Sequence, residues 1–140
     1  MTVQTKSPTL TKVSTFAPFV GGLPWVDHAN IKVQDAAEAI CSLPGVDPFT
    51  EGLIGYSFGS TVPGGEAIDG IKVEWYLSCD IGLTYDQIVR IKPSGAWGGS
   101  ELADGVAWPT TAAYKVFGGA TELWGQAWTP ATINAADFSV

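Results

Sequence analysis

The sequence predicts an all-β protein, with an antiparallel β-sandwich or jelly roll at residues 21–140 and an extended N-terminal arm at residues 1–20. Three observations favour this class. The 17 glycines and 9 prolines are spread along the whole chain, which suits short segments joined by tight turns. Short apolar segments alternate with turn residues from residue 21 onward. The 140 residues are 46% hydrophobic and 15% charged, which suits one folded domain with one core.

The first 20 residues differ from the rest in composition. They are rich in Thr and Ser, contain Pro8 and Pro18, and show little hydrophobic periodicity. We interpret them as an arm that docks on a neighbouring molecule. A frayed terminus is the alternative, because chain ends are commonly disordered unless they are docked on something.

Residues 71–79 are the longest strand candidate. Hydrophobic side chains alternate with polar ones, and successive side chains of a strand point to opposite faces of the sheet. One face would carry Ile71, Val73, Trp75, Leu77 and Cys79, and the other Lys72, Glu74, Tyr76 and Ser78. This pattern predicts an antiparallel strand with one buried face, and it places Trp75 in the core.

Shorter segments are expected to complete the sheets. Residues 53–59, 85–92 and 113–117 read as strands, and turn-forming glycines and prolines follow each of them. Residues 36–43 have helical propensity but are only two turns long and stop at Pro44, so their local state is ambiguous.

Residues 137–140 begin a last strand that the chain does not finish. An unfinished strand leaves an open sheet edge, which native proteins usually cover. The strand is therefore short, or a neighbouring subunit completes the sheet, or the parent protein continues.

The charge excludes several classes of partner. Fourteen acidic residues against seven basic ones give a net charge of −7, the wrong sign for binding nucleic acid or an anionic membrane. No apolar run approaches a membrane span, and the N-terminus lacks a signal-peptide pattern, so we expect a soluble chain synthesised in a cytoplasm.

Few residues suggest catalysis or metal binding. His28 is the single histidine, and residues 55–59 match a nucleophile elbow in spacing but read as a strand. Acidic side chains that could be paired for hydrolysis are Glu74, Glu101, Asp104 and Glu122, although most acids here read as solvated or turn residues. Cys41 and Cys79 lie in apolar segments and read as buried free thiols. We expect no enzyme activity, no metal and no cofactor.

Tryptophan is the strongest compositional signal, with six in the chain. Trp97 and Trp108 are candidates for a platform that stacks sugars or inserts into a protein interface. The alternative is that the tryptophans form a tryptophan-rich core.

The segment LWGQAWTPATIN (residues 123–134) has a local physical interpretation. Thr129 is placed as the N-cap of a one-turn helix, and Pro130 as its first residue. Trp124 and Trp128 would then pin this turn, which ends near Asn134, against the rest of the fold. The motif would therefore be structural.

This segment also carries a resemblance to a known family. Together with GIKV (70–73), WPT (108–110) and DFSV (137–140), it resembles a β-sandwich domain recurrent in tailed-phage virion proteins, over about residues 25–140. The chain departs from the family pattern at Glu122, where Asp is common, and at Ser139, where Gly is common. The resemblance implies that residues 36–43 are a strand.

The resemblance implies a bacteriophage virion structural protein. Because the chain is one small domain with an arm and lacks fibre repeats, we expect a capsid decoration, or cement, protein on the capsid exterior. The implied partners are the major capsid protein and the chain itself as a homotrimer, with the arm or an open strand augmenting a neighbour's sheet. The alternative is a carbohydrate-binding attachment module of a phage fibre or tail, with glycan as its ligand.

Overall fold

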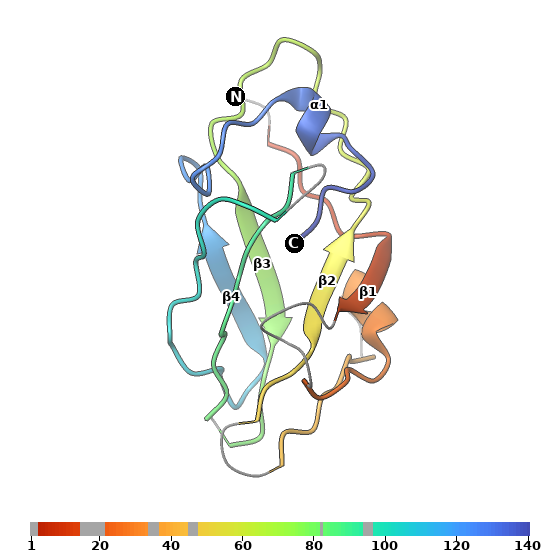
Figure 1. The fold of residues 1–140 in the computed structure, drawn as a ribbon, viewed down its shortest axis with the longest axis vertical. Helices are drawn as coiled ribbons and strands as arrows, with labels where there is room; N and C mark the ends of the chain where they lie inside the picture. Colours follow the sequence, from red (N-terminus) through yellow and green to blue (C-terminus); the bar gives the residue numbers. More distant parts are fainter. Residues whose placement is uncertain (1–2, 15–21, 34–36, 45–47, 82, 94–96) are drawn as a thin grey trace. The chain divides into compact units, whose positions relative to one another are not determined.

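The structure is a computed structural model that describes residues 3–14, 22–33, 37–44, 48–81, 83–93 and 97–140. Its strands are β1 (Leu10–Ser14), β2 (Gly52–Tyr56), β3 (Lys72–Leu77) and β4 (Ala113–Gly118), as Figure 1 shows. The described helices are short, a 3-10 helix η1 (His28–Lys32) and the single turn α1 (Pro130–Ile133). The predicted β-rich class is therefore confirmed, with two small antiparallel sheets, β1–β2 and β3–β4.

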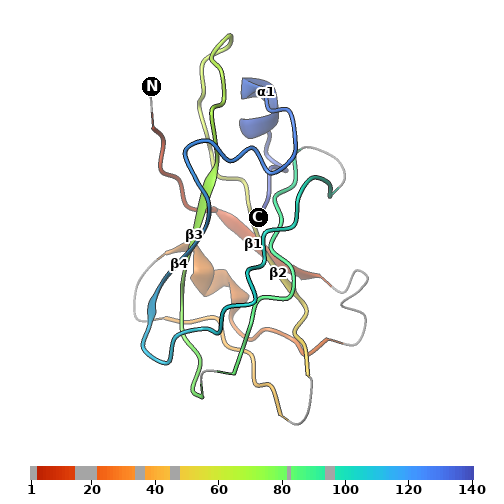
Figure 2. The same ribbon diagram turned by 90° about the vertical axis from the view of Figure 1, so that its left-hand side faces the viewer.

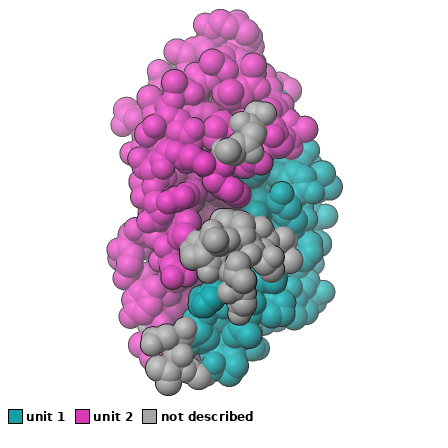
Figure 3. Space-filling view, in the orientation of Figure 1, with its two compact units in different colours: residues 1–60, 139 teal, residues 61–138, 140 magenta. Residues whose placement is uncertain are grey.

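The chain divides into two compact units, coloured separately in Figure 3. Unit 1 comprises residues 1–60 and 139, and unit 2 comprises residues 61–138 and 140. The predicted arm at residues 1–20 belongs to unit 1 and includes β1, while residues 1–2 and 15–20 lie outside the described part of the chain.

Unit 1 is organised by the antiparallel pairing of β1 with β2, which runs from Leu10 opposite Tyr56 to Ser14 opposite Gly52. Ile54 of β2 is buried, with 3% of its surface exposed. The predicted strand at 53–59 ends at Tyr56, because Ser57 has a φ of +59°, outside the range of a strand. Ser139 then pairs with Tyr56 through an isolated antiparallel bridge, so part of the predicted last strand is paired.

The predicted segment at 36–43 forms neither a helix nor a continuous strand at its described residues, 37–43. Ile40 makes one antiparallel bridge to Val26, with backbone N–H···O distances of 2.8 and 3.0 Å. The short stretch before Pro44 is too brief to propagate a helix, and its pairing is confined to this bridge.

Unit 2 is built around β3 and β4, which pair from Lys72 opposite Gly118 to Leu77 opposite Ala113. The predicted alternation is confirmed: Val73 is buried and Trp75 half-buried, while Lys72 and Tyr76 are exposed. The predicted strand at 113–117 is also present as β4.

The core described for the chain lies in unit 2. Its buried side chains are Val73, Val89, Ile91, Phe117 and Trp124. Half-buried side chains packed against them include Trp75, Leu102 and Trp128. Trp124 and Ile91 are fully buried, and burying large apolar side chains in this way is the main favourable term in folding.

The prediction of a continuous strand at 85–92 is wrong. Tyr85 makes only an isolated bridge to Ala107, although Val89 and Ile91 are buried at the predicted period of two. The backbone N–H of Val89 donates to the carboxylate of Glu101 (2.9 Å), not to a backbone carbonyl. A side chain has taken the place of a ladder partner, so regular pairing stops there.

Candidate functional site

Trp124 is the centre of the tryptophan motif. Its indole N–H donates to the carbonyl of Ile71 (2.9 Å), and its backbone N–H donates to the carboxylate of Glu122. Its backbone carbonyl accepts from the N–H of Ser100 (2.8 Å). Trp124 has a φ of +55°, which is unfavourable for a bulky residue and persists only where surrounding contacts fix it.

Gly118 makes room for this tryptophan. A Cβ at residue 118 would collide with the carbonyl oxygen of Ile71 and lie 2.8 Å from the indole nitrogen of Trp124. Its φ of +72° also favours glycine. The end of β4 and the indole therefore fit together only without a side chain at 118.

Trp128 pins the second half of the motif. Its indole N–H donates to the carbonyl of Leu123 (2.8 Å), which closes a loop over residues 123–128. Its ring meets that of Phe138 edge-on, with centroids 5.8 Å apart and planes at 81°. Such edge-to-face contact is a favoured aromatic geometry.

The helix signals at Thr129 and Pro130 are confirmed. Thr129 is the N-cap of α1 and accepts a hydrogen bond from the N–H of Thr132, while the Thr132 hydroxyl accepts from the N–H of Thr129. Pro130 occupies the start of the helix, where a missing N–H costs nothing.

Asn134 ends α1 and ties it to a distant segment. Its side-chain oxygen accepts from the N–H of Val62 (2.9 Å), and its amide NH₂ donates to the carbonyl of Val62 (2.8 Å). Figures 1 and 2 both show α1 beside the loop at 61–70. Trp124, Trp128, Thr129 and Asn134 thus each make hydrogen bonds within the fold through their side chains.

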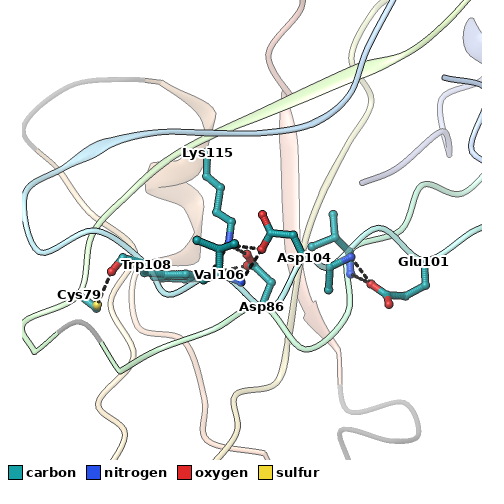
Figure 4. Close-up of polar contacts among 9 residues, drawn as sticks. Cys79, Asp86, Glu101, Asp104, Val106, Trp108 and Lys115 are labelled. Carbon is teal, nitrogen blue, oxygen red and sulfur yellow. Dashed lines mark hydrogen bonds and ion pairs between the residues drawn. The ribbon is translucent and has the colours of Figure 1, made fainter. Parts of the chain in front are cut away.

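A network of charges lies on the inner side of β4 (Figure 4). The ammonium of Lys115 is 2.6 Å from the carboxylate of Asp86, 2.9 Å from that of Asp104, and 2.7 Å from the carbonyl oxygen of Val106. The side chains of Lys115 and Asp86 are only 10% and 11% exposed, whereas that of Asp104 is 41% exposed. Two carboxylates therefore surround one largely buried cation.

Two members of the network, Asp104 and Lys115, have pKa values shifted in the direction that favours their charged forms. The hydrogen bond from Lys115 holds the pKa of Asp104 below its ordinary value, helped by the N–H of Val106. Burial works to lower the pKa of Lys115, but the hydrogen bonds to Asp104 and Asp86 outweigh it and raise that pKa. A protonated lysine is not a nucleophile or a base, so this arrangement is suited to holding segments together.

The structure places Trp108 beside this network. Its indole N–H donates to the carboxylate of Asp86 (3.0 Å), and its carbonyl accepts a weak hydrogen bond from the thiol of Cys79. Trp108 and Trp97 are each half-buried. Trp108 thus uses its polar atom within the fold, and the predicted role of both rings as a ligand platform stays a prediction.

The acidic candidates are occupied by structural contacts. Glu101 accepts from the N–H groups of Val89 and Ala103, and Glu74 forms an exposed ion pair with Lys72 at 3.1 Å. His28 shares a hydrogen bond with the hydroxyl of Thr11 (2.9 Å). Within the described part of the chain, no group of three or more His, Cys, Asp or Glu side chains is arranged to hold a metal ion.

Both cysteines are free thiols, as predicted, but each is half-buried, not fully buried. Burial, aided by Glu51, raises the pKa of Cys41, which makes this thiol less reactive. The helices among the described residues are all too short or too polar to cross a membrane.

An exposed aromatic pair was not among the candidates from the sequence. Tyr76 on β3 and Tyr114 on β4 face each other across the sheet, with ring centroids 5.0 Å apart and planes at 58°. They are 49% and 55% exposed. The alternation in residues 71–79 already placed Tyr76 on the outer face, but pairing it with Tyr114 required the register of β3 and β4.

A hollow of about 410 Å³, open to solvent, lies beside the C-terminal half of β4. Its lining combines backbone and apolar atoms with polar side chains: Leu102, Asp104, Val116, Phe117, Gly118, Gly119, Thr121 and Glu122. Neither Tyr76 nor Tyr114 lines the hollow, but Val116 does; it is 47% exposed and lies two residues from Tyr114 on the same strand face.

Comparison of the chain with family models, curated proteins and solved structures found no match.

Proposed function

We propose that this chain is a structural protein of a bacteriophage virion, a capsid decoration protein that binds between major capsid subunits on the exterior of the head. In this proposal the two small sheets are parts of a β-sandwich or jelly roll, and three copies assemble on the capsid lattice. The basis is the resemblance of residues 25–140 to virion domains.

The observation that carries the proposal is that the polar side-chain atoms of the tryptophan motif bond within the fold. Trp124, Trp128, Thr129 and Asn134 direct their polar atoms to Ile71, Leu123, Thr132 and Val62, all within unit 2. The residues that define the resemblance thus maintain a scaffold and leave no reactive group in the motif. A scaffold of this kind suits a protein whose role is to bind and reinforce.

Electrostatics are consistent with this role. The net charge of −7 opposes binding to packaged DNA and favours a protein partner. The acidic candidates Glu101, Asp104 and Glu122 each accept backbone hydrogen bonds, so they lack the freedom expected of a catalytic acid or base.

The test is assembly on capsids. The mass of the purified chain in solution is measured first, and then its copy number on undecorated capsids of the parent phage. We expect a trimer that saturates at a fixed number per lattice position. A chain that leaves capsids unoccupied at saturating concentration would overturn the proposal.

A matched pair of variants shows whether binding needs the intact scaffold. Trp124→Ala removes the buried ring, whereas Leu123→Ala changes the adjacent exposed side chain. Capsid binding should be lost with Trp124→Ala and kept with Leu123→Ala.

A further inference from the structure

We propose that the outer face of β3 and β4, together with the hollow beside β4, binds an uncharged oligosaccharide. The site comprises the rings of Tyr76 and Tyr114, the exposed side chain of Val116, and the polar rim at Thr121 and Glu122. This inference is independent of capsid binding and goes beyond it.

The tyrosine pair supplies the stacking surface. The π face of an aromatic ring is electron-rich, and the C–H groups on the apolar face of a pyranose pack against it. Because the two rings are tilted by 58°, they form an open angle and not a flat floor. A chain of sugar units can lay one face on each ring.

The hollow supplies polar contacts next to this surface. The hollow has a volume of about 410 Å³ and is open to solvent, so it would contact one side of a ligand without enclosing it. The Thr121 hydroxyl can donate or accept a hydrogen bond to a sugar hydroxyl. One carboxylate oxygen of Glu122 accepts from the N–H of Trp124, which leaves its second oxygen to accept from a sugar hydroxyl. Val116 lines the hollow and lies two residues from Tyr114, which connects the two parts.

Charge at this site disfavours an anionic ligand, because the carboxylates of Asp104 and Glu122 line the hollow and no basic side chain does. Lys72 and Glu74, the remaining charged side chains on the outer face of β3, neutralise each other at 3.1 Å. An acidic polysaccharide would meet a chain of net charge −7, and its approach would be opposed.

The size of the face argues against a second copy of the chain as its occupant. A stable interface buries about 800 Å² from each partner, which involves about 20 to 30 residues. The outer face offers three exposed large apolar side chains, Tyr76, Tyr114 and Val116, on two strands of six residues each.

The experiment titrates the full chain with maltohexaose, cellohexaose and chitohexaose, followed by calorimetry and by saturation-transfer NMR. We expect at least one of these neutral probes to bind at millimolar concentration or below, with transfer to tyrosine protons. Hexagalacturonate, the acidic probe, should not bind.

Variants locate the site. Tyr76→Ala and Tyr114→Ala should each weaken binding by about tenfold, and Thr121→Val by a smaller factor of about three. Tyr85→Ala is the matched control, because Tyr85 is a tyrosine of similar exposure, 52%, outside this face. Its affinity should equal that of the unchanged chain.

Three results would overturn the inference: no binding by any neutral probe, equal loss in the Tyr85→Ala control, or a change of oligomeric state in Tyr76→Ala that identifies the face as a subunit contact. Capsid binding by the same variants is scored separately. Loss of saccharide binding with capsid binding intact supports the site. Loss of capsid binding with saccharide binding intact would be a fourth result against the inference, because it assigns the face to the capsid.

Discussion

Unit 1 and unit 2 are each stabilised by a different kind of internal contact. Unit 2 contains the cluster of five buried side chains around Trp124 and a nearly buried ion network. In the described part of unit 1, Ile54 is the one buried hydrophobic side chain, and the main contacts are strand pairing and isolated bridges. Because burial of apolar surface outweighs single hydrogen bonds in net free energy, we expect unit 2 to be the more stable.

The largest expected effect is that of Trp124→Ala in unit 2. Removing a fully buried ring and its hydrogen bond to Ile71 should lower the free energy of unfolding by about 3 to 5 kcal/mol. The counterpart is Trp25→Ala in unit 1, where a half-buried indole donates to the carbonyl of Glu51 and the loss should be smaller. Urea denaturation measures both, and equal losses would contradict the contrast between the units.

Lys115→Met should cause the second-largest loss in the free energy of unfolding. It leaves the carboxylate of Asp86, 11% exposed, without its cation, and breaking a buried pair costs about 3 kcal/mol or more. Lys72→Met is the control on the opposite face of the same sheet, where the exposed pair with Glu74 is worth about 0 to 1 kcal/mol. If the two variants have the same melting temperature, the buried ion network stabilises unit 2 no more than the exposed Lys72–Glu74 pair does.

Asn134→Ala tests the link between α1 and residue 62. Losing two hydrogen bonds to the backbone of Val62 should cost about 1 to 2 kcal/mol. Amide hydrogen exchange should quicken at Val62 and leave Ile54 in unit 1 unchanged. Unchanged protection at Val62 would show that the loop is held by other contacts.

The smallest effect concerns pH. The lowered pKa of Asp104 means that its contribution is complete above its ordinary value of 3.8 and is lost as the pH falls through the lower folded-state value. The raised pKa of Lys115 means that its contribution is complete below 10.5 and is lost as the pH rises through the higher folded-state value.

Stability differences between the unchanged chain and Asp104→Asn, measured from pH 2 to 7, test the acid limb. The difference should be constant near neutral pH and shrink below pH 3.8. A difference that stays constant to the lowest pH would show that the charge of Asp104 does not contribute to stability through the ion network.

The sequence predicted unit 2 better than unit 1, for a physical reason. The period of two in residues 72–77 and the cap at Thr129 are local signals, and both are confirmed. The alternation in residues 71–79 placed Trp75 on the inner face, where it packs, half-buried, against the cluster that contains Trp124. Unit 1 depends on isolated bridges such as Val26 to Ile40, for which a short sequence carries no pattern.

The ion network could be predicted from the local sequence pattern only in part. Residues 115 and 117 share a strand face, so Lys115 could be placed beside buried Phe117 from alternation alone. A lysine there requires anionic partners. Asp86 and Asp104 come from irregular segments, and no spacing in the sequence indicates that they meet. The same holds for Glu101, whose side chain interrupts the expected pairing at 85–92.

The position of Trp124 along the chain has a consequence for how the protein is made. Its indole bonds to the carbonyl of residue 71, 53 positions earlier, and β3 pairs with a strand that begins at residue 113. Chains dominated by such distant contacts fold slowly, and synthesis proceeds at about 5 to 20 residues per second. Strand β3 therefore leaves the ribosome seconds before its partner and its tryptophan exist. The apolar face of β3 is therefore exposed during this interval. A chaperone that shields it should raise the yield of soluble protein on expression.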